Sequence, residues 1–258
     1  MAGVLPGIML TVLFILVISL KSLVNPEIAP PGPKTSAGEK WKATWDAMPM
    51  ITVILISIGG IYFGVFTPAE AAGVGAFLIS AIALLGGHMK LGDFLPVLVE
   101  TTQTTAMLFF IIIGAAVFGP FLSLASIPES LASGLAELNL GTWGALTAIL
   151  ITYIILGTFL ESLSLVVITI PIVFPIITGL GINPIWFGVL VVIVVEMGLI
   201  TPPVGLNVFV VKGVAGDEIS LAQVFAGVFP FWVAMLVGLV ILIAFPSISL
   251  FLPSTMFN

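Results

Sequence analysis

The sequence contains no cysteine and no arginine, and it carries little charge of either sign. The lack of cysteine excludes disulfides, thiolate nucleophiles and cysteine-based metal sites. With six basic and twelve acidic residues the net charge is −6, so no basic surface could neutralise phosphates, and no nucleic-acid partner is expected. Only 7% of the residues are charged, against about 25% in ordinary soluble domains, which excludes a soluble fold.

Residues suited to enzyme chemistry are also scarce. His88 is the single histidine, so no second imidazole is available for a metal site. The three aspartates, Asp46, Asp93 and Asp217, fall in or beside polar loops, which excludes the paired membrane aspartates of an intramembrane aspartyl protease. No glycine-rich phosphate loop with a lysine occurs. We therefore expect no enzyme, no catalytic residue and no cofactor.

Long apolar runs, in contrast, are abundant, and 60% of the residues are hydrophobic. A helical span of a bilayer needs about 20 mainly apolar residues, and helices satisfy their own backbone hydrogen bonds in lipid. The sequence therefore predicts an all-α integral membrane protein in a lipid bilayer. Its apolar stretches lie at about residues 3–20, 48–66, 69–86, 94–124, 143–177, 184–211 and 229–252.

The lysines predict how these stretches are oriented. Four of the six lie in the polar segment 21–47, which we expect to be the longest aqueous loop and, being lysine-rich, cytoplasmic. Following the chain from there places the other two, Lys90 and Lys212, on the same face and residues 126–141 outside. The first apolar run has no positively charged segment before it, so we expect a true span rather than a cleaved signal.

The stretch 143–177 divides into two apolar halves, each shorter than a comfortable span. Between them lies the sequence Gly-Thr-Phe-Leu-Glu-Ser, residues 157–162. Two interpretations are open: an ordinary pair of short helices, or a re-entrant hairpin whose polar tip lies near mid-membrane. The second is tolerated only where the backbone is packed in protein or lines a cavity.

The next stretch is interrupted by Gly-Leu-Ile-Thr-Pro-Pro-Val-Gly, residues 198–205. Tandem prolines remove two backbone donors and prevent a regular helix there. Breaking a span in lipid leaves polar backbone groups that need partners, and a bound ion or substrate is one such partner in secondary transporters. A proline kink in a structural helix is the alternative, but Gly198 and Asn207 beside the prolines favour a functional break.

Five motifs together are similar to one known family: Phe66-Thr-Pro-Ala-Glu-Ala71, Gly157-Thr-Phe-Leu-Glu161, Pro171-Ile-Val-Phe-Pro175, Gly181-Ile-Asn-Pro-Ile-Trp-Phe-Gly188 and Glu196-Met-Gly-Leu-Ile-Thr-Pro-Pro-Val-Gly-Leu-Asn207. On these residues, and over nearly its whole length, the sequence resembles the large membrane subunit of TRAP (tripartite ATP-independent periplasmic) transporters. The combination of motifs is specific.

The resemblance implies a Na⁺-driven uptake system for small organic acids, of the dicarboxylate or sugar-acid class, in the bacterial inner membrane. Such systems work with a periplasmic substrate-binding protein and a small membrane subunit. The implied fold is half of an elevator-type secondary transporter with one re-entrant helical hairpin and one broken transmembrane helix. The expected parts are transmembrane helices with a cytoplasmic loop (1–125), the hairpin and Pro-Pro break (126–213), and an amphipathic segment with the last transmembrane helix (214–258).

One departure from the family concerns the first half. The family's large subunit is a long chain whose first half carries an equivalent hairpin and break, and such repeats close around one midplane site. This sequence has one hairpin and one break, and Met1-Ala-Gly-Val-Leu-Pro-Gly7 resembles the middle of the family sequence. We therefore expect a C-terminal fragment or one half of a split subunit.

In family terms the hairpin tip and the break supply one Na⁺ site and half of a substrate cavity. Glu161 and Glu196 are expected at this cavity, either as ion ligands or as acceptors for the hairpin's own backbone. Glu70 is expected to cap a helix instead. The Na⁺ candidates are Gly157, Thr158, Thr201 and Gly205, and the full set of expected ion- or substrate-binding residues adds Glu161, Ser162, Glu196, Pro202, Pro203, Val204 and Asn207.

Two other functions stay open at this point. One is a non-transporting helical scaffold that assembles with other subunits. The other is a different cation-coupled organic-anion carrier, which would not depend on a periplasmic binding protein.

Overall fold

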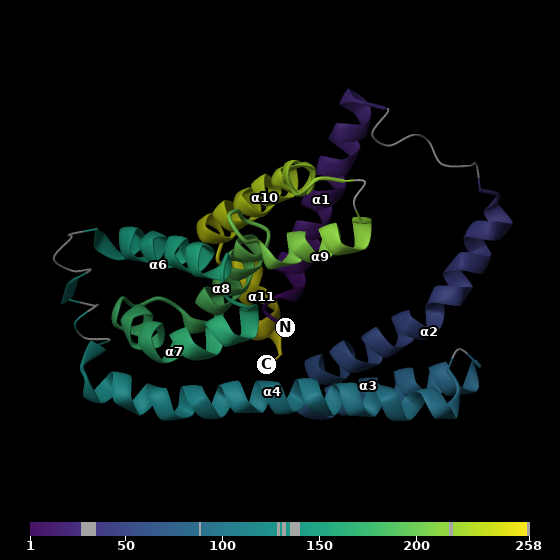
Figure 1. Ribbon diagram of the computed structural model, residues 1–258, viewed down its shortest axis with the longest axis horizontal. Coiled ribbons are helices and arrows are strands. Elements are labelled where there is room, and N and C mark those ends of the chain that lie inside the picture. The colour runs from purple at the N-terminus through teal and green to yellow at the C-terminus, as the bar shows by residue number, and fades with distance from the viewer. Residues whose placement is uncertain are drawn as a thin grey trace. The chain divides into compact units, whose positions relative to one another are not determined.

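The structure is a computed structural model that describes residues 1–26, 35–87, 89–127, 130, 133–134, 140–216 and 219–256. The helices labelled in Figure 1 are α1 (Val4–Val24), α2 (Ala37–Tyr62), α3 (Pro68–Leu85), α4 (Leu91–Leu124), α6 (Gly141–Gly157), α7 (Ser162–Gly179), α8 (Pro184–Leu199), α9 (Leu206–Ala215), α10 (Leu221–Ala244) and α11 (Ser247–Thr255). The described chain contains no strand, which confirms the all-α prediction.

Six of these helices, α1, α2, α3, α4, α7 and α10, are long and apolar enough to cross a membrane. Three apolar helices are shorter: α6 has 17 residues, α8 has 16 and α9 has 10. The short helices flank the two interruptions that the sequence predicts, at residues 157–162 and 198–205. Their course through a bilayer stays a prediction.

The segment 21–47, predicted as an aqueous loop, is helical at both of its ends, while its position in water stays a prediction. Helix α1 continues to Val24, and α2 already begins at Ala37, eleven residues before the apolar stretch. The reason is a capping box, in which Ser36 accepts from the backbone N–H of Glu39 and the Glu39 carboxylate accepts from that of Ser36. Lys34, His88 and Asp217 lie outside the described residues.

The last apolar stretch, predicted as one run at 229–252, is divided between two helices. Helix α10 begins at Leu221 behind a second capping box, made by Ser220 and Gln223, and ends at Ala244. Pro246 follows and separates α10 from α11, because proline lacks the N–H that a continuous helix would need.

The chain forms two compact units. The first comprises residues 24–105 with Met1 and the last six residues. Within it α2 packs on α3, where Val53 and Ala71 are buried and Gly75 lies against Ser57. Thr67 and Glu70 form a capping box at the start of α3, which confirms the predicted role of Glu70.

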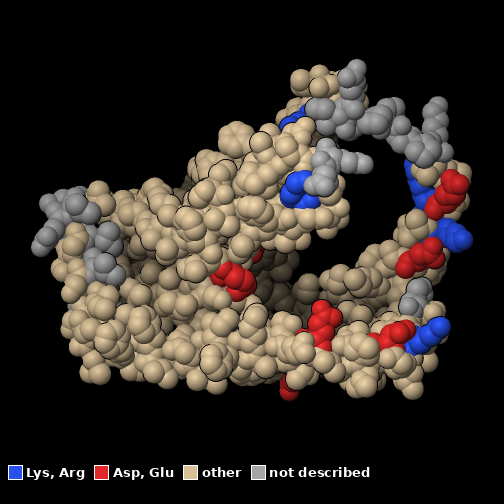
Figure 2. Space-filling view, viewed as in Figure 1, with Lys and Arg blue, Asp and Glu red and all other residues tan. Residues whose placement is uncertain are grey.

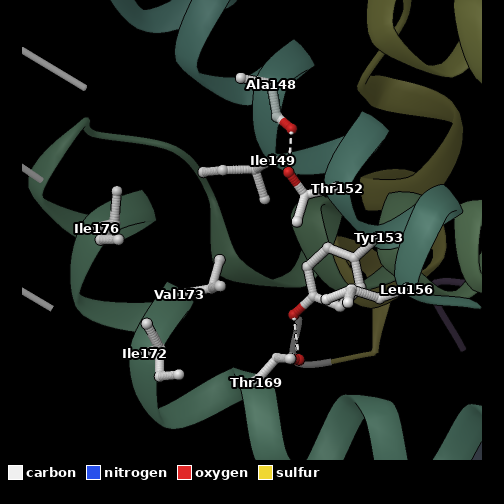
Figure 3. A pocket seen from close by; sticks show the side chains of 9 residues that line it. All are labelled: Ala148, Ile149, Thr152, Tyr153, Leu156, Thr169, Ile172, Val173 and Ile176. Carbon is white, nitrogen blue, oxygen red and sulfur yellow. Dashed lines mark hydrogen bonds between the residues drawn. The ribbon is translucent and has the colours of Figure 1, made fainter. Parts of the chain in front are cut away.

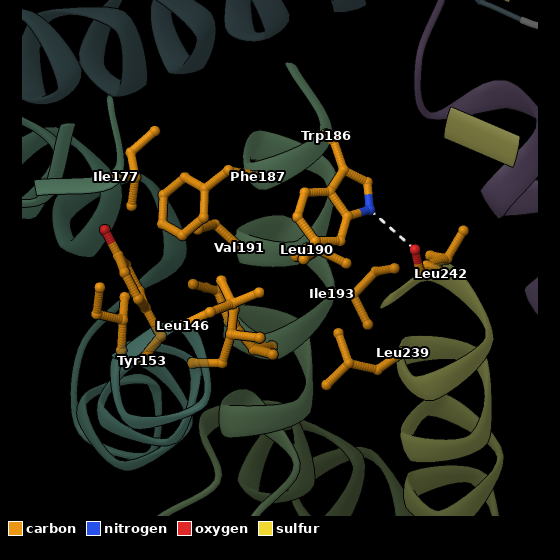
Figure 4. Packing of buried hydrophobic residues seen from close by; sticks show 14 of the residues in the cluster. Leu146, Tyr153, Ile177, Trp186, Phe187, Leu190, Val191, Ile193, Leu239 and Leu242 are labelled. Carbon is orange, nitrogen blue, oxygen red and sulfur yellow. Dashed lines mark hydrogen bonds between the residues drawn. The ribbon is translucent and has the colours of Figure 1, made fainter. Parts of the chain in front are cut away.

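The second unit comprises residues 2–23 and 106–252, and α8 is its centre. Ten of the sixteen residues of α8 are buried, and α6, α7 and α10 all pack against it. Apart from Glu196, α8 is apolar on all sides, and a helix of this kind belongs inside a bundle. Figure 4 shows this core, in which the indole N–H of Trp186 donates to the carbonyl of Leu242 on α10, at 2.9 Å.

The surface agrees with a lipid environment. Large apolar side chains are exposed along α1, α2 and α4, and Figure 2 shows charged side chains only as scattered spots on an otherwise uncharged face. On a soluble protein such a surface would be an aggregation hazard, whereas in a bilayer it faces hydrocarbon.

Candidate functional site

The first interruption is the turn at residues 158–161, between α6 and α7. Glu161 is the N-cap of α7, and its carboxylate accepts from the backbone N–H groups of Leu163 and Ser164, each at 3.0 Å. It also accepts from the Ser164 hydroxyl at 3.1 Å. Of the two predicted roles for Glu161, the structure therefore contains hydrogen bonding to the hairpin's own backbone, while ion binding by this residue stays a prediction.

The end of α6 lies directly on the end of α8, with glycine on both sides of the contact. A Cβ atom on Gly198 would lie 2.7 Å from the Cα of Gly157 and 2.8 Å from the carbonyl oxygen of Ile154. A Cβ on Gly157 would lie 3.1 Å from the carbonyl oxygen of Val195. The two backbones therefore touch without intervening side chains, as small residues allow in membrane helix packing.

The second interruption separates α8 from α9. The backbone leaves the helix after Leu199, and Gly205, with φ +60°, precedes α9 in the left-handed conformation that glycine adopts readily. Pro202 and Pro203 are joined by a cis peptide bond, and neither has an N–H. In the described chain, no backbone N–H donates to the carbonyl oxygens of Thr201, Pro202 or Pro203.

The two interruptions meet. The backbone N–H of Gly205 donates to the carbonyl oxygen of Thr158 across an N···O distance of 3.4 Å, a long hydrogen bond. Thr158 is only 3% exposed, and its hydroxyl donates to the carbonyl of Ile155 at 2.8 Å. A second link lies alongside, because the Ser162 hydroxyl donates to the Glu196 carboxylate at 3.2 Å. The turn is thus bonded both to the break and to α8.

Thr201 lies at the start of the break and is bonded on two sides. Its hydroxyl donates to the carbonyl of Met197 at 2.5 Å and accepts from the indole N–H of Trp232 on α10 at 3.0 Å. Trp232 was not among the residues that the sequence singled out, because nothing in the sequence pairs it with Thr201, 31 residues away. The signal available in the sequence was its spacing of seven and three residues from Phe225 and Phe229, which places the three aromatic residues on one face of a helix.

The structure brings together most, but not all, of the predicted site residues. Gly157, Thr158, Ser162, Glu196, Thr201 and Gly205 lie at or beside the meeting point. Pro202 and Pro203 are exposed in the break, and Val204 is half-buried. Asn207 is exposed on the first turn of α9 and makes no side-chain hydrogen bond within the described part of the chain.

Two cavities lie in the second unit, one of them at the break. One, of about 390 Å³, is lined by residues of the break and of α10: Ile200, Thr201, Pro202, Phe225, Ala226, Phe229 and Trp232. The other, of about 210 Å³, lies between α6 and α7 and is almost wholly apolar (Figure 3). Its polar groups are hydroxyls. That of Thr152 donates to the carbonyl of Ala148 at 2.8 Å, and those of Tyr153 and Thr169 share a 2.7 Å hydrogen bond. This bond joins α6 to α7 away from the turn.

Comparison of the sequence with known proteins identifies relatives of this chain. Residues 1–248 match the family described as "Tripartite ATP-independent periplasmic transporter, DctM component". The chain is 39% identical, over 98% of its length, to the C4-dicarboxylate TRAP transporter large permease protein DctM of Pseudomonas aeruginosa. It is 32% identical, over 86% of its length, to the sialic acid permease SiaM of Vibrio cholerae, and 29% identical, over its whole length, to the ectoine permease TeaC of Halomonas elongata.

The chain spans 58%, 52% and 60% of the lengths of these three relatives, respectively. The family match nevertheless covers nearly all of the chain itself. The protein therefore belongs to the DctM, or large permease, component of TRAP transporters, a family of multi-pass transporter subunits of the bacterial inner membrane rather than of enzymes.

Proposed function

We propose that this chain supplies one half of the coupling-ion and substrate site of a Na⁺-coupled, binding-protein-dependent importer of small organic acids. The observation that carries the proposal is the bond from the Gly205 N–H to the Thr158 carbonyl, which joins the turn to the break. In this proposal α6 and α7 form a re-entrant hairpin, and α8 with α9 forms one broken transmembrane helix.

The helix ends give the meeting point a preference for a cation. Helices α6 and α8 both end there, at Gly157 and Leu199, and the C-terminal end of a helix carries partial negative charge. The free carbonyl oxygens of Thr201 and the two prolines add hard oxygen ligands. Unwound carbonyls and helix C-termini of this kind hold Na⁺ in secondary transporters.

An anionic substrate is favoured at the helix starts beside the break. Helices α7 and α9 both begin close to it, and helix N-termini carry partial positive charge. Glu161 already occupies the N-terminus of α7, whereas α9 begins without a side-chain cap. We infer that a substrate carboxylate binds toward the start of α9, near Asn207.

The substrate class follows from the relatives and from this electrostatic arrangement. The relatives' names specify C4-dicarboxylate, sialic acid and ectoine. The similarity to the dicarboxylate permease is the greatest of these three, and we propose the dicarboxylate or sugar-acid class. The family description implies a tripartite system, so we propose a periplasmic binding protein and a small membrane subunit as partners.

The test is Na⁺-dependent uptake of organic acids into proteoliposomes, with the chain assembled with its binding protein and membrane subunits. Thr201→Val removes a hydroxyl while keeping the shape, and we expect the half-saturating Na⁺ concentration to rise about tenfold, the equivalent of about 1.4 kcal/mol. Thr201→Ser keeps the hydroxyl and is the matched control.

Three outcomes would contradict the proposal. If normally expressed Thr201→Val keeps the wild-type Na⁺ dependence of uptake, the assignment of the ion site to the break is wrong. Uptake without a binding protein would indicate a different cation-coupled carrier. A fully assembled system that transports none of the acids would favour a scaffold role.

A further inference from the structure

Helix α10 lies against the break along one face, although it belongs to neither interruption. Phe225, Phe229 and Trp232 are spaced by four and three residues, so they line one side of the helix, and all three border the 390 Å³ cavity. The rings of Phe229 and Trp232 are stacked, with centroids 6.3 Å apart and planes 6° apart. We refer to this face, made by Phe225, Phe229 and Trp232, as the aromatic wall beside the break.

The wall contacts both ends of the break. At one end, a Cβ on Gly205 would lie 3.0 Å from the ring of Phe225, so ring and backbone are in close contact. At the other end, the Trp232 indole donates to the Thr201 hydroxyl. Among the described residues, this is the one polar side-chain bond between α10 and the break.

We propose that Trp232 is a positioning residue for the coupling ion, acting through Thr201. A threonine hydroxyl has one proton and two lone pairs. The proton of Thr201 is directed to the Met197 carbonyl, and Trp232 occupies one lone pair, so the second lone pair has a fixed direction. An oxygen held in this way coordinates Na⁺ without first having to be ordered.

This inference rests on the proposed function, because it assigns a partner to the ion site in the break. It adds that α10 takes part in ion binding. Without the indole N–H the hydroxyl keeps only its bond to the Met197 carbonyl, and the start of the break loses its polar link to α10. Half-saturation by Na⁺ should then require a higher concentration, while the maximal uptake rate changes little.

Trp186 provides a matched control. It also donates its indole N–H to a partner on α10, the carbonyl of Leu242, but it lies at the far end of α8 from the break. Trp232→Phe and Trp186→Phe each delete one interhelical hydrogen bond and keep an aromatic ring. They therefore match in the kind of bond removed and differ in distance from the proposed ion site, and Trp186 is the more deeply buried of the two.

The experiment measures uptake against Na⁺ concentration, in the complete transport system, for both tryptophan variants, for Thr201→Val and for Thr201→Val combined with Trp232→Phe. We expect Trp232→Phe to raise the half-saturating concentration about three- to tenfold, equivalent to about 0.6–1.4 kcal/mol, and Trp186→Phe to leave it unchanged. The double variant should equal Thr201→Val alone, because residues that act through one another are not additive.

The outcomes separate this inference from the proposed function. If the wild type and Thr201→Val behave as proposed but Trp232→Phe leaves Na⁺ dependence unchanged, the inference alone is wrong. If Trp186→Phe shifts Na⁺ dependence equally, the effect is general destabilisation, and the inference is again wrong. If wild-type uptake does not depend on Na⁺, both the inference and the proposed function are wrong.

Discussion

The two helices on either side of the break differ sharply in packing. Ten of the sixteen residues of α8 are buried, but only one of the ten in α9, Val208. The break thus joins an anchored helix to a sparsely packed one. Segments with few buried contacts open at the lowest free-energy cost. We therefore expect a change of conformation at the break to move α9 more readily than the core around α8.

The largest effect is expected where α8 touches α6. In Gly198→Ala the new methyl would lie within 2.8 Å of backbone atoms of α6, which cannot move aside as a side chain can. We expect a loss of about 1–3 kcal/mol in the free energy of unfolding, the usual cost of overpacking. Thermal unfolding of the purified protein in detergent measures this loss of stability.

Gly188→Ala is the matched control, because Gly188 is on the same helix with nothing within 4 Å of its Cβ position. Replacing that glycine should stabilise α8 by up to about 1 kcal/mol, through helix propensity alone. Equal effects of the two substitutions would show that the Gly157–Gly198 contact is not tight, and the anchoring of α8 would then rest on its buried side chains alone.

A smaller effect is expected at the start of α7. Glu161→Ala removes the N-cap acceptor, which should lower the free energy of unfolding by about 1 kcal/mol. Glu161→Asn keeps a side-chain acceptor but removes the charge, so it should retain stability. If the carboxylate serves only the backbone, the Asn variant should also retain its half-saturating Na⁺ concentration in the uptake assay. A rise there would assign Glu161 to the ion as well.

Features encoded in local sequence could be predicted. The helix ends at 157–162 and 198–205 follow from short apolar halves and tandem prolines. The early start of α2 was also readable, since Ser36 and Glu39 have the capping-box spacing, but the lysines beside them suggested a loop. The pairing of Gly157 with Gly198 and of Thr201 with Trp232 was not readable, because it depends on which helices lie side by side.

The smallest effect should come from the hydrogen bond that holds the turn to α8 near its exposed edge. Ser162→Ala removes the donor to Glu196, a residue on the exposed side of α8. Interhelical bonds of this kind contribute about 0.6 kcal/mol on average, so thermal stability should hardly change, while amide hydrogen exchange in the turn should rise about threefold. Exchange in the middle of α8 is the internal control and should stay constant. A hundredfold rise in amide exchange in the turn would mean that this bond holds the turn in place, rather than the glycine contact and the Thr158–Gly205 bond. Any rise in amide exchange in the middle of α8 would mean the same.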